Sequence, residues 1–355
     1  MKILKFLLSM LFAFAFNATM ASVLSPIAGL TFTSVFVGLN VLSLIPMPHG
    51  VALMAVQKEI WVNDIVEALY KANPFLNFAQ NGDGYVLNGK VVHIPQAGAS
   101  PSVSKNRSSL PATVNKRTDT DVTFALDEYT SDPVLIPNAD NYELSYDKRN
   151  SVLANSKSAI SELMAEWILR SWSPATNIVR TTGAAVAAHT PSATGNRKAI
   201  TWPDISALQK TMNKDSVDKA DRFIMLDSDM YQMLVDALSE SQYRDFSAGL
   251  DIANGILGKR YGFSFMERST VAVYGNETTP VCKDPGAAGA SADNAAAIAW
   301  QKMSVIKAVG TVDFFEDLKN PQYYGDVYST LVRAGGRIYR NDGKGVYAIV
   351  EAAST

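Results

Sequence analysis

Few residues in this chain could do catalytic chemistry, and they are scattered. Cys282 is the only cysteine, and the three histidines, His49, His93 and His189, lie far apart in the sequence. A single cysteine excludes a disulfide and a cysteine-based zinc site within one chain. Cys282 could be a reactive thiol, but no recognisable base accompanies it. His93 lies in the strand-like run VVHIP, where we expect a hydrogen-bonded strand histidine instead of a ligand or base.

Acidic residues offer no better site. Two pairs have the Asp-x-Asp spacing that can hold Mg²⁺, namely Asp119 with Asp121 and Asp227 with Asp229. The first pair lies in a polar stretch, and Asp227 stands where it would cap the helix that follows. Asp127-Glu128 would point to opposite faces of a strand, so it does not form an acid/base pair. The motifs GxSxG, HExxH, GxxxxGK[ST] and GxGxxG do not occur.

These observations predict no catalytic residues, no metal site and no cofactor, so we expect a protein that is not an enzyme. A hydrolase with an unrecognised site remains an alternative. The 355 residues are 47% hydrophobic and 10% aromatic, which is typical of a folded chain with room for one large or two ordinary domains. The formal charge is −2 with both signs mixed along the chain, so the basic stripe of a nucleic-acid groove is missing.

The N-terminal residues 1–53 differ from the rest. Lys2 and Lys5 are their only charged side chains, and no acidic residue occurs among them. Residues 1–22 have the charged start, apolar run and small-residue end of a secretory signal. The apolar run 27–45 approaches the roughly 20 residues that span a bilayer. Three interpretations stay open: an exported or membrane-anchored protein, a removable pro-segment, or an upstream extension of a reading frame that starts at Met54.

The remaining chain shows interleaved helix and strand patterns. Helical spacing of apolar residues predicts helices over 59–73, 147–172, 203–212 and 228–239. Branched and aromatic residues favour strands over 91–95, 121–126, 222–226, 263–274, 297–309, 328–340 and 346–350. Asn88-Gly89 is the strongest hairpin signal, and the small, polar residues 181–199 are typical of a linker or surface loop. Without regular βαβ spacing, the fold class is α+β.

The helix predicted over 147–172 is the longest, at about 38 Å for a straight α-helix. Its apolar residues repeat on a single face and are Ile160, Leu163, Met164, Trp167 and Ile168. Pro174 closes it.

The sequence AGASPSVSKNRSSLPATVNKRT, residues 97–118, separates two predicted strands. Compact domains seldom contain structureless connections longer than about 12–15 residues unless these are functional or disordered. Only Val103, Leu110 and Val114 can bury much surface here. Four cations give this loop a local positive charge: Lys105, Arg107, Lys116 and Arg117. Because its own chain offers it no surface, we expect the loop to lie on another copy of the protein.

Longer runs resemble a known family. The runs VLNGKVVHIPQAGASPSVSKNR and DTDVTFALDEYTSDPVLIPNADNYELSYDKR, followed by the long helix, resemble major capsid proteins of tailed bacteriophages with the Hong Kong 97-type fold. The C-terminal run AAIAWQKMSVIKAVGTVDFFEDLKNPQYYGDVYSTLVRAGGRIYRNDGKGVYAIV is similar to the ending of the same group. The likeness extends over roughly residues 54–352.

The resemblance implies a division of the chain into the parts of a capsid subunit. These would be an N-terminal arm region (54–84), an extended loop (85–126), a peripheral domain (127–200) with a spine helix (147–172), a mainly axial domain (201–300) and strands returning to the peripheral domain (301–355). Relatives often begin with a charged scaffolding segment that is removed, whereas residues 1–53 are apolar. We therefore expect residues 1–53 to be removed or not translated.

The implied function is that of a major capsid protein, which assembles into hexamers and pentamers of an icosahedral phage head around double-stranded DNA. Its place would be the virion capsid, assembled in the host cytoplasm, and it would contact DNA only non-specifically. Portal, scaffold or maturation protease would be its other partners, and no membrane is expected. Lys105, Arg107, Lys116 and Arg117 would contact acidic surface on a neighbouring subunit. The alternative is an exported or membrane-anchored surface or adhesion protein.

Overall fold

The computed structural model describes residues 33, 73–87, 90–96, 103, 105–107, 114, 116, 120–137, 148–275 and 278–354. All except Thr33 belong to one compact unit, Trp61–Thr355. The interpretations of residues 1–53 and the helix predicted over 59–73 lie outside the described residues, apart from Thr33 and Asn73. No helix in the described part of the chain is long and apolar enough to cross a membrane.

The centre of the unit is an eight-stranded mixed sheet. Its strands are β7 (Ile178–Arg180), β10 (Arg222–Asp227), β11 (Gly258–Arg260), β12 (Phe263–Arg268), β13 (Ala272–Gly275), β14 (Val281–Cys282), β15 (Asn294–Gln301) and β18 (Val346–Val350). Every residue of β10, β15 and β18 is buried. Successive side chains of a strand point to opposite faces, so both faces of this sheet are covered.

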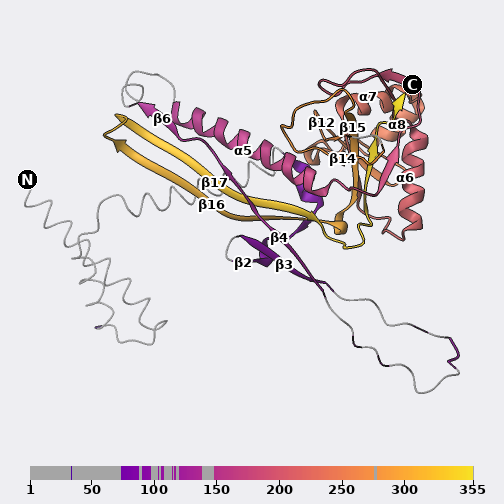
Figure 1. The fold of residues 1–355 in the computed structure, drawn as a ribbon, viewed down its shortest axis with the longest axis horizontal. Coiled ribbons are helices and arrows are strands. Elements are labelled where there is room, and N and C mark those ends of the chain that lie inside the picture. The colour runs from indigo at the N-terminus through magenta and orange to yellow at the C-terminus, as the bar shows by residue number, and fades with distance from the viewer. Residues whose placement is uncertain are drawn as a thin grey trace, which may run out of the picture. The chain divides into compact units, whose positions relative to one another are not determined.

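Three helices cover one face of the sheet, as Figure 1 shows for α6 (Trp202–Lys214), α7 (Ser228–Asp236) and α8 (Glu240–Ser247). Thr201 and Asp204 form a capping box at the start of α6, because the Asp204 carboxylate accepts a 2.9 Å hydrogen bond from the Thr201 backbone N–H. Ile224 and Leu226 of β10 pack with these helices, whereas Phe223 and Met225 join the core on the other face. The helices predicted over 203–212 and 228–239 and the strand predicted over 222–226 are confirmed.

The long helix α5 (Lys148–Trp172) contributes to the core on that other face. Its buried residues are Ile160, Ser161, Met164, Ala165, Ile168, Leu169 and Trp172. The prediction that Leu163 faces the core was wrong, because its side chain is 45% exposed. The buried stripe includes Ala165 and Leu169 in its place, which rotates the core-facing side of the helix away from Leu163.

A second sheet is built on a long hairpin, β16 (Val305–Asn320) with β17 (Gly325–Ile338). The strands β1 (Gln80–Asn81), β5 (Asp127–Thr130) and β6 (Val134–Pro137) complete it. Figure 1 shows α5 running along this hairpin, and Ile168 and Trp172 of the helix share the core with Val332 and Ala334 of β17. The strand predicted over 328–340 is part of a longer element. The single strand predicted over 297–309 was wrong, because a 3-10 turn, η4 (Lys302–Ser304), separates β15 from β16 and the two strands belong to different sheets.

A third, three-stranded sheet contains β2 (Val86–Leu87), β3 (Val91–Gln96) and β4 (Thr120–Ala125). Val86 pairs with Val92, which confirms the predicted hairpin, and β3 pairs with β4 from Val91 opposite Ala125 to Gln96 opposite Thr120. The two strands that flank residues 97–119 are therefore neighbours. Buried side chains of this sheet pack on the base of β16.

The segment predicted to be a linker or surface loop, 181–199, contains two strands. These are β8 (Ala185–Ala187) and β9 (Asn196–Lys198), which form a small sheet with β19 (Ala353–Ser354). Three-residue strands of alanine and polar residues are too short to show a period of two in the sequence. Three further 3-10 turns are described: η1 (Pro74–Phe78), η2 (Asp83–Tyr85) and η3 (Ile252–Asn254).

Candidate interaction surfaces

The residues that were candidates for catalysis or metal binding have structural roles. His93 Nδ1 lies 2.8 Å from Asp121 Oδ2 across β3 and β4, which confirms a hydrogen-bonded strand histidine. Asp227 caps α7, since its Oδ1 accepts a 2.7 Å hydrogen bond from the Met230 backbone N–H. Burial raises the pKa of the Cys282 thiol, so the reactive thiolate is disfavoured. No group of three His, Cys, Asp or Glu residues in the described ranges could hold a metal ion.

The structure does bring together an ionic cluster that the sequence did not indicate. His189 Nε2 lies 2.9 Å from Asp227 Oδ2, and His189 Nδ1 lies 3.5 Å from Glu351 Oε1. The Glu351 side chain is 1% exposed, and its Oε2 accepts a hydrogen bond from the Ala295 backbone N–H. The hydrogen bond with Asp227 raises the pKa of His189, and burial raises the pKa of Glu351. This cluster joins the segment before β9 to the central sheet and to the chain's C-terminal end.

The cluster makes stability depend on pH. The His189 pKa is raised on folding, so its contribution is complete below the unfolded value of about 6.5 and is lost as pH rises through the folded pKa. The raised pKa of Glu351 acts in the same direction. We expect the free energy of unfolding to fall from pH 6 upward, and to fall less steeply in His189→Gln, as measured by urea denaturation at a series of pH values.

The matched control is His93→Gln. His93 also contacts a carboxylate, with Nδ1 2.8 Å from Asp121 Oδ2, but these side chains are 44% and 47% exposed. Exposed pairs contribute about 0–1 kcal/mol, so this variant should stay close to the wild-type stability. An equally steep pH profile for the wild type and His189→Gln would contradict the role of the buried cluster.

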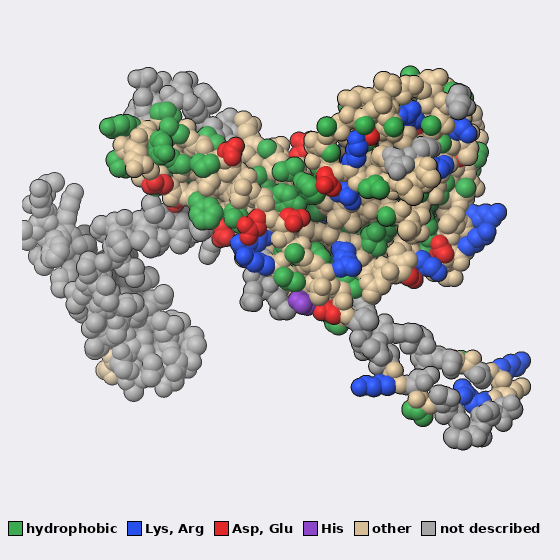
Figure 2. All heavy atoms as spheres, in the orientation of Figure 1, with side chains coloured by type: hydrophobic (Ala, Val, Ile, Leu, Met, Phe, Trp, Pro, Cys, Tyr) green, Lys and Arg blue, Asp and Glu red, His purple; other side chains and the backbone are tan. Residues whose placement is uncertain are grey.

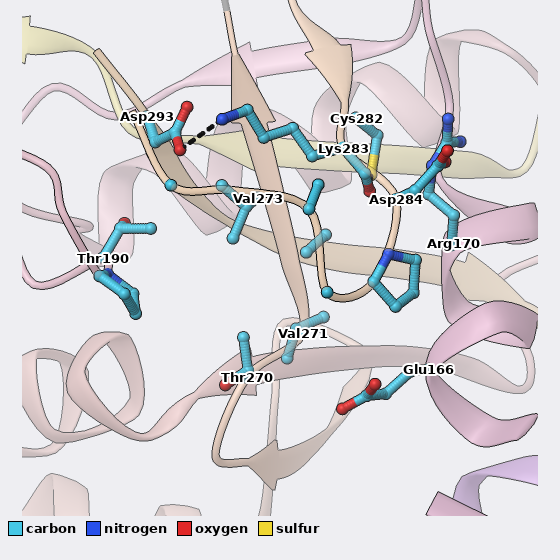
Figure 3. A pocket seen from close by; sticks show the side chains of 16 residues that line it. Glu166, Arg170, Thr190, Thr270, Val271, Val273, Cys282, Lys283, Asp284 and Asp293 are labelled. Atoms are coloured by element: carbon cyan, nitrogen blue, oxygen red, sulfur yellow. Dashed lines mark hydrogen bonds and ion pairs between the residues drawn. The ribbon is translucent and has the colours of Figure 1, made fainter. Parts of the chain in front are cut away.

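One cavity of about 250 Å³ lies beside α5 and the segment 270–293 (Figure 3). Charged groups at its rim are already paired: Arg170 Nε with Asp284 Oδ1 at 3.0 Å, and Lys283 Nζ with Asp293 Oδ2 at 2.7 Å. The only sulfur at its wall belongs to the buried thiol of Cys282. The wall holds no nucleophile with an adjacent base among the described residues. The cavity therefore gives no support to an enzymatic site.

The loop predicted to contact a neighbour presents its described side chains to solvent. Val103 is 95% exposed and Val114 is 96% exposed. Lys105, Arg107 and Lys116 are exposed as well, and none of the three has an ion-pair partner among the described residues. Arg117 lies outside the described residues. Figure 2 shows the blue side chains of this segment standing apart from the rest of the protein surface.

Exposed apolar side chains gather at another place, the turn of the β16–β17 hairpin (Figure 2). Five large ones are described there: Leu135 at 39%, Phe315 at 51%, Leu318 at 37%, Tyr323 at 56% and Tyr324 at 80% exposure. Isolated exposed apolar residues are common on protein surfaces, whereas a group at the end of one element marks an interaction site. Sequence reasoning missed this group because residues 310–327 were not recognised as a hairpin.

The fold is shared with solved bacteriophage capsid structures. The capsid of Ralstonia phage GP4 is 13% identical with a TM-score of 0.56, over 78% of this chain and 88% of that one. The capsid of cyanophage P-SCSP1u is 17% identical with a TM-score of 0.54, over 78% and 87%. For cyanophage Pam1 the values are 11%, 0.54, 78% and 91%. No protein-family model matches the sequence, and no curated protein is significantly similar. The predicted α+β fold, which these capsids share, is confirmed.

Proposed function

We propose that this chain is the major capsid protein of a tailed bacteriophage. The observation that carries the proposal is the shared fold, which covers more than three quarters of this chain and most of each neighbour named above. Two features of the described residues support an assembly subunit: an exposed basic loop and an exposed apolar hairpin end. The paired charges around the cavity and the buried thiol favour a structural protein over an enzyme.

The parts of a Hong Kong 97-type subunit are assigned as follows. The long helix α5 is the spine helix, and β5, β6, β16 and β17 belong with it to the peripheral domain. The central sheet with α6, α7 and α8 is the mainly axial domain, expected over 201–300, and β7 and β18 add to this sheet from the ranges expected for the peripheral domain, 127–200 and 301–355. Residues 85–126 are the extended loop and 54–84 the arm region, while residues 1–53 are removed or not translated. The core around α5 also contains residues of the central sheet, such as Phe223 and Trp300, so the two assigned domains pack against each other.

The mechanism is self-assembly into hexamers and pentamers of an icosahedral head that encloses double-stranded DNA. Each copy repeats the same contacts, so modest contact energies add up over a closed shell. The basic side chains Lys105, Arg107, Lys116 and Arg117 contact acidic surface on a neighbouring copy. Portal, scaffold and maturation protease are the other proposed partners, and the assembled product is the virion capsid, formed in the host cytoplasm.

The test is expression of the full chain in bacteria, followed by sedimentation and electron microscopy of the soluble fraction. We expect most of the protein to sediment as large particles of regular diameter. Protein that remains in the membrane fraction would favour the alternative, an exported or membrane-anchored adhesion protein. A stable monomer at high concentration would contradict the assembly proposal.

A further inference from the structure

His189 lies between two carboxylates that come from distant parts of the chain. Asp227 is the last residue of β10, and Glu351 follows β18 directly. The two ring nitrogens of His189 face one carboxylate each, at 2.9 Å from Asp227 Oδ2 and 3.5 Å from Glu351 Oε1. The three side chains are 16%, 9% and 1% exposed, in the order His189, Asp227, Glu351. Because the cluster is buried, water cannot readily replace a contact that is lost within it.

The cluster needs one proton more than a neutral imidazole supplies. A neutral imidazole carries a proton on only one of its two ring nitrogens. Either tautomer therefore leaves one nitrogen lone pair facing a carboxylate oxygen, which is a repulsive contact between two acceptors. A second proton, shared between His189 and Glu351, turns both contacts into pairs of donor and acceptor. Neither His189 Nδ1 nor Glu351 Oε1 has another hydrogen-bond partner among the described residues.

The other charged groups near His189 do not replace this second proton. Arg197 of β9 donates its hydrogen bonds to backbone carbonyls of the neighbouring segments. Arg180 of β7 donates to the Glu351 backbone carbonyl at 2.9 Å. Asp229 of α7 adds a further negative charge near the ring. Loss of the second proton therefore leaves buried carboxylates beside a neutral ring, which is an unfavourable arrangement.

The segment that contains His189 has little apolar surface to hold it in place. All of residues 181–199 are described, and none of them belongs to a hydrophobic core cluster. Their strands β8 and β9 form the small sheet with β19, and Lys198 N–H donates a 2.8 Å hydrogen bond to the Ala352 carbonyl. Segments with few buried apolar contacts open locally at a low cost in free energy. The attachment of the small sheet to the central sheet thus depends on polar contacts such as those of His189.

We infer that the cluster of His189, Asp227 and Glu351 is a pH-dependent latch that holds the small sheet on the central sheet. The latch is closed while the second proton is shared between His189 and Glu351, and it opens when this proton leaves. Opening releases β8, β9 and β19, whereas β10 and its neighbours in the central sheet stay folded. The hydrogen bond with Asp227 raises the pKa of His189, so the latch opens above the ordinary histidine value of about 6.5.

Hydrogen exchange of the full chain, followed by mass spectrometry, tests the latch. Protection factors correct for the intrinsic effect of pH on exchange, so a change in them reports opening. Between about pH 6 and about pH 9, those of peptides from β8, β9 and β19 should fall roughly tenfold, the factor that one unit of pKa shift supplies. The protection factors of β10 peptides should change much less.

Two variants should alter the response in opposite directions. Glu351→Gln places an amide beside His189 Nδ1 that can accept from the protonated ring or donate to the neutral one, so the small sheet should stay protected at both pH values. His189→Gln removes the imidazole, so protection at about pH 6 should already lie near the wild-type value at about pH 9. The control His93→Gln changes an exposed histidine and should keep the wild-type response.

Three results would overturn the latch: small-sheet protection in the wild type that does not depend on pH, an equal fall in β10, or a full pH response in Glu351→Gln. The cluster lies within one chain, so these outcomes do not depend on whether copies assemble, and the proposed function is tested separately.

Discussion

Trp172→Ala should lower the free energy of unfolding by about 4 kcal/mol, from the loss of a buried side chain and of its indole hydrogen bond. Trp172 is 0% exposed at the end of α5, with ring centroids 5.9 Å from Phe75 and 5.7 Å from Trp300. Its indole N–H donates a 3.1 Å hydrogen bond to the Ile306 carbonyl of β16. The residue thus connects the long helix, the long hairpin and the central sheet, and its removal should loosen all three.

The measurement is denaturant unfolding of the full chain followed by tryptophan fluorescence and circular dichroism. Leu163→Ala is the matched control on the same helix, because Leu163 is 45% exposed. It should change the stability by less than about 1 kcal/mol. Trp172→Phe keeps a ring in the core and should show a smaller loss of about 1–2 kcal/mol, from the missing indole hydrogen bond and the smaller ring. Similar losses in Trp172→Ala and Leu163→Ala would contradict the packing described here.

Gly345→Ala should lower the free energy of unfolding by about 3 kcal/mol, from backbone strain and overpacking. Gly345 has a φ of +93°, in the left-handed region, and its carbonyl accepts a 2.9 Å hydrogen bond from the Gln301 N–H at the end of β15. A Cβ at this position would lie 2.7 Å from Ser304 Cβ and closer still to Ser304 Oγ. Ser304 is 2% exposed, so it has little room to move aside.

Two further variants separate backbone strain from collision. Gly343 has a φ of +67°, but a Cβ there would meet only Asn177 Nδ2 at an ordinary 3.7 Å. Gly343→Ala should therefore show the strain alone, about 1 kcal/mol. Adding Ser304→Gly to Gly345→Ala should recover about 1–2 kcal/mol as a coupling energy. Additive losses in thermal denaturation of these variants would show that the collision does not occur.

The sequence predicted the parts of the fold where the periodicity is strong. The helices α5, α6 and α7 and the strands β3, β4, β10, β17 and β18 lie where the patterns placed them. The secondary structure of long amphipathic or fully buried segments can be predicted from the local spacing of their apolar residues. The prediction that Leu163 of α5 faces the core was wrong. The rotation of a helix about its axis depends on the elements that pack against it, and the apolar residues of the helix alone do not specify those elements.

The interaction surfaces were only half predictable. Polar composition and length drew attention to the segment 97–119, and its cations remain a prediction about a neighbouring copy. The exposed apolar group at the turn of the β16–β17 hairpin could not be found in the same way, because the sequence pattern did not show residues 310–327 to be a hairpin. Likewise, His189, Asp227 and Glu351 are distant in sequence, and only the fold brings the segment between β8 and β9, the end of β10 and the residue after β18 together.

The central claim is that the segment 97–119 finds its buried surface on a second copy of the protein. A cryo-electron-microscopy map of particles formed by the full chain tests it most directly. We predict continuous density for this segment across the surface of an adjacent subunit. Density that folds the segment back over its own subunit, or a soluble monomer in which it packs intramolecularly, would contradict the account.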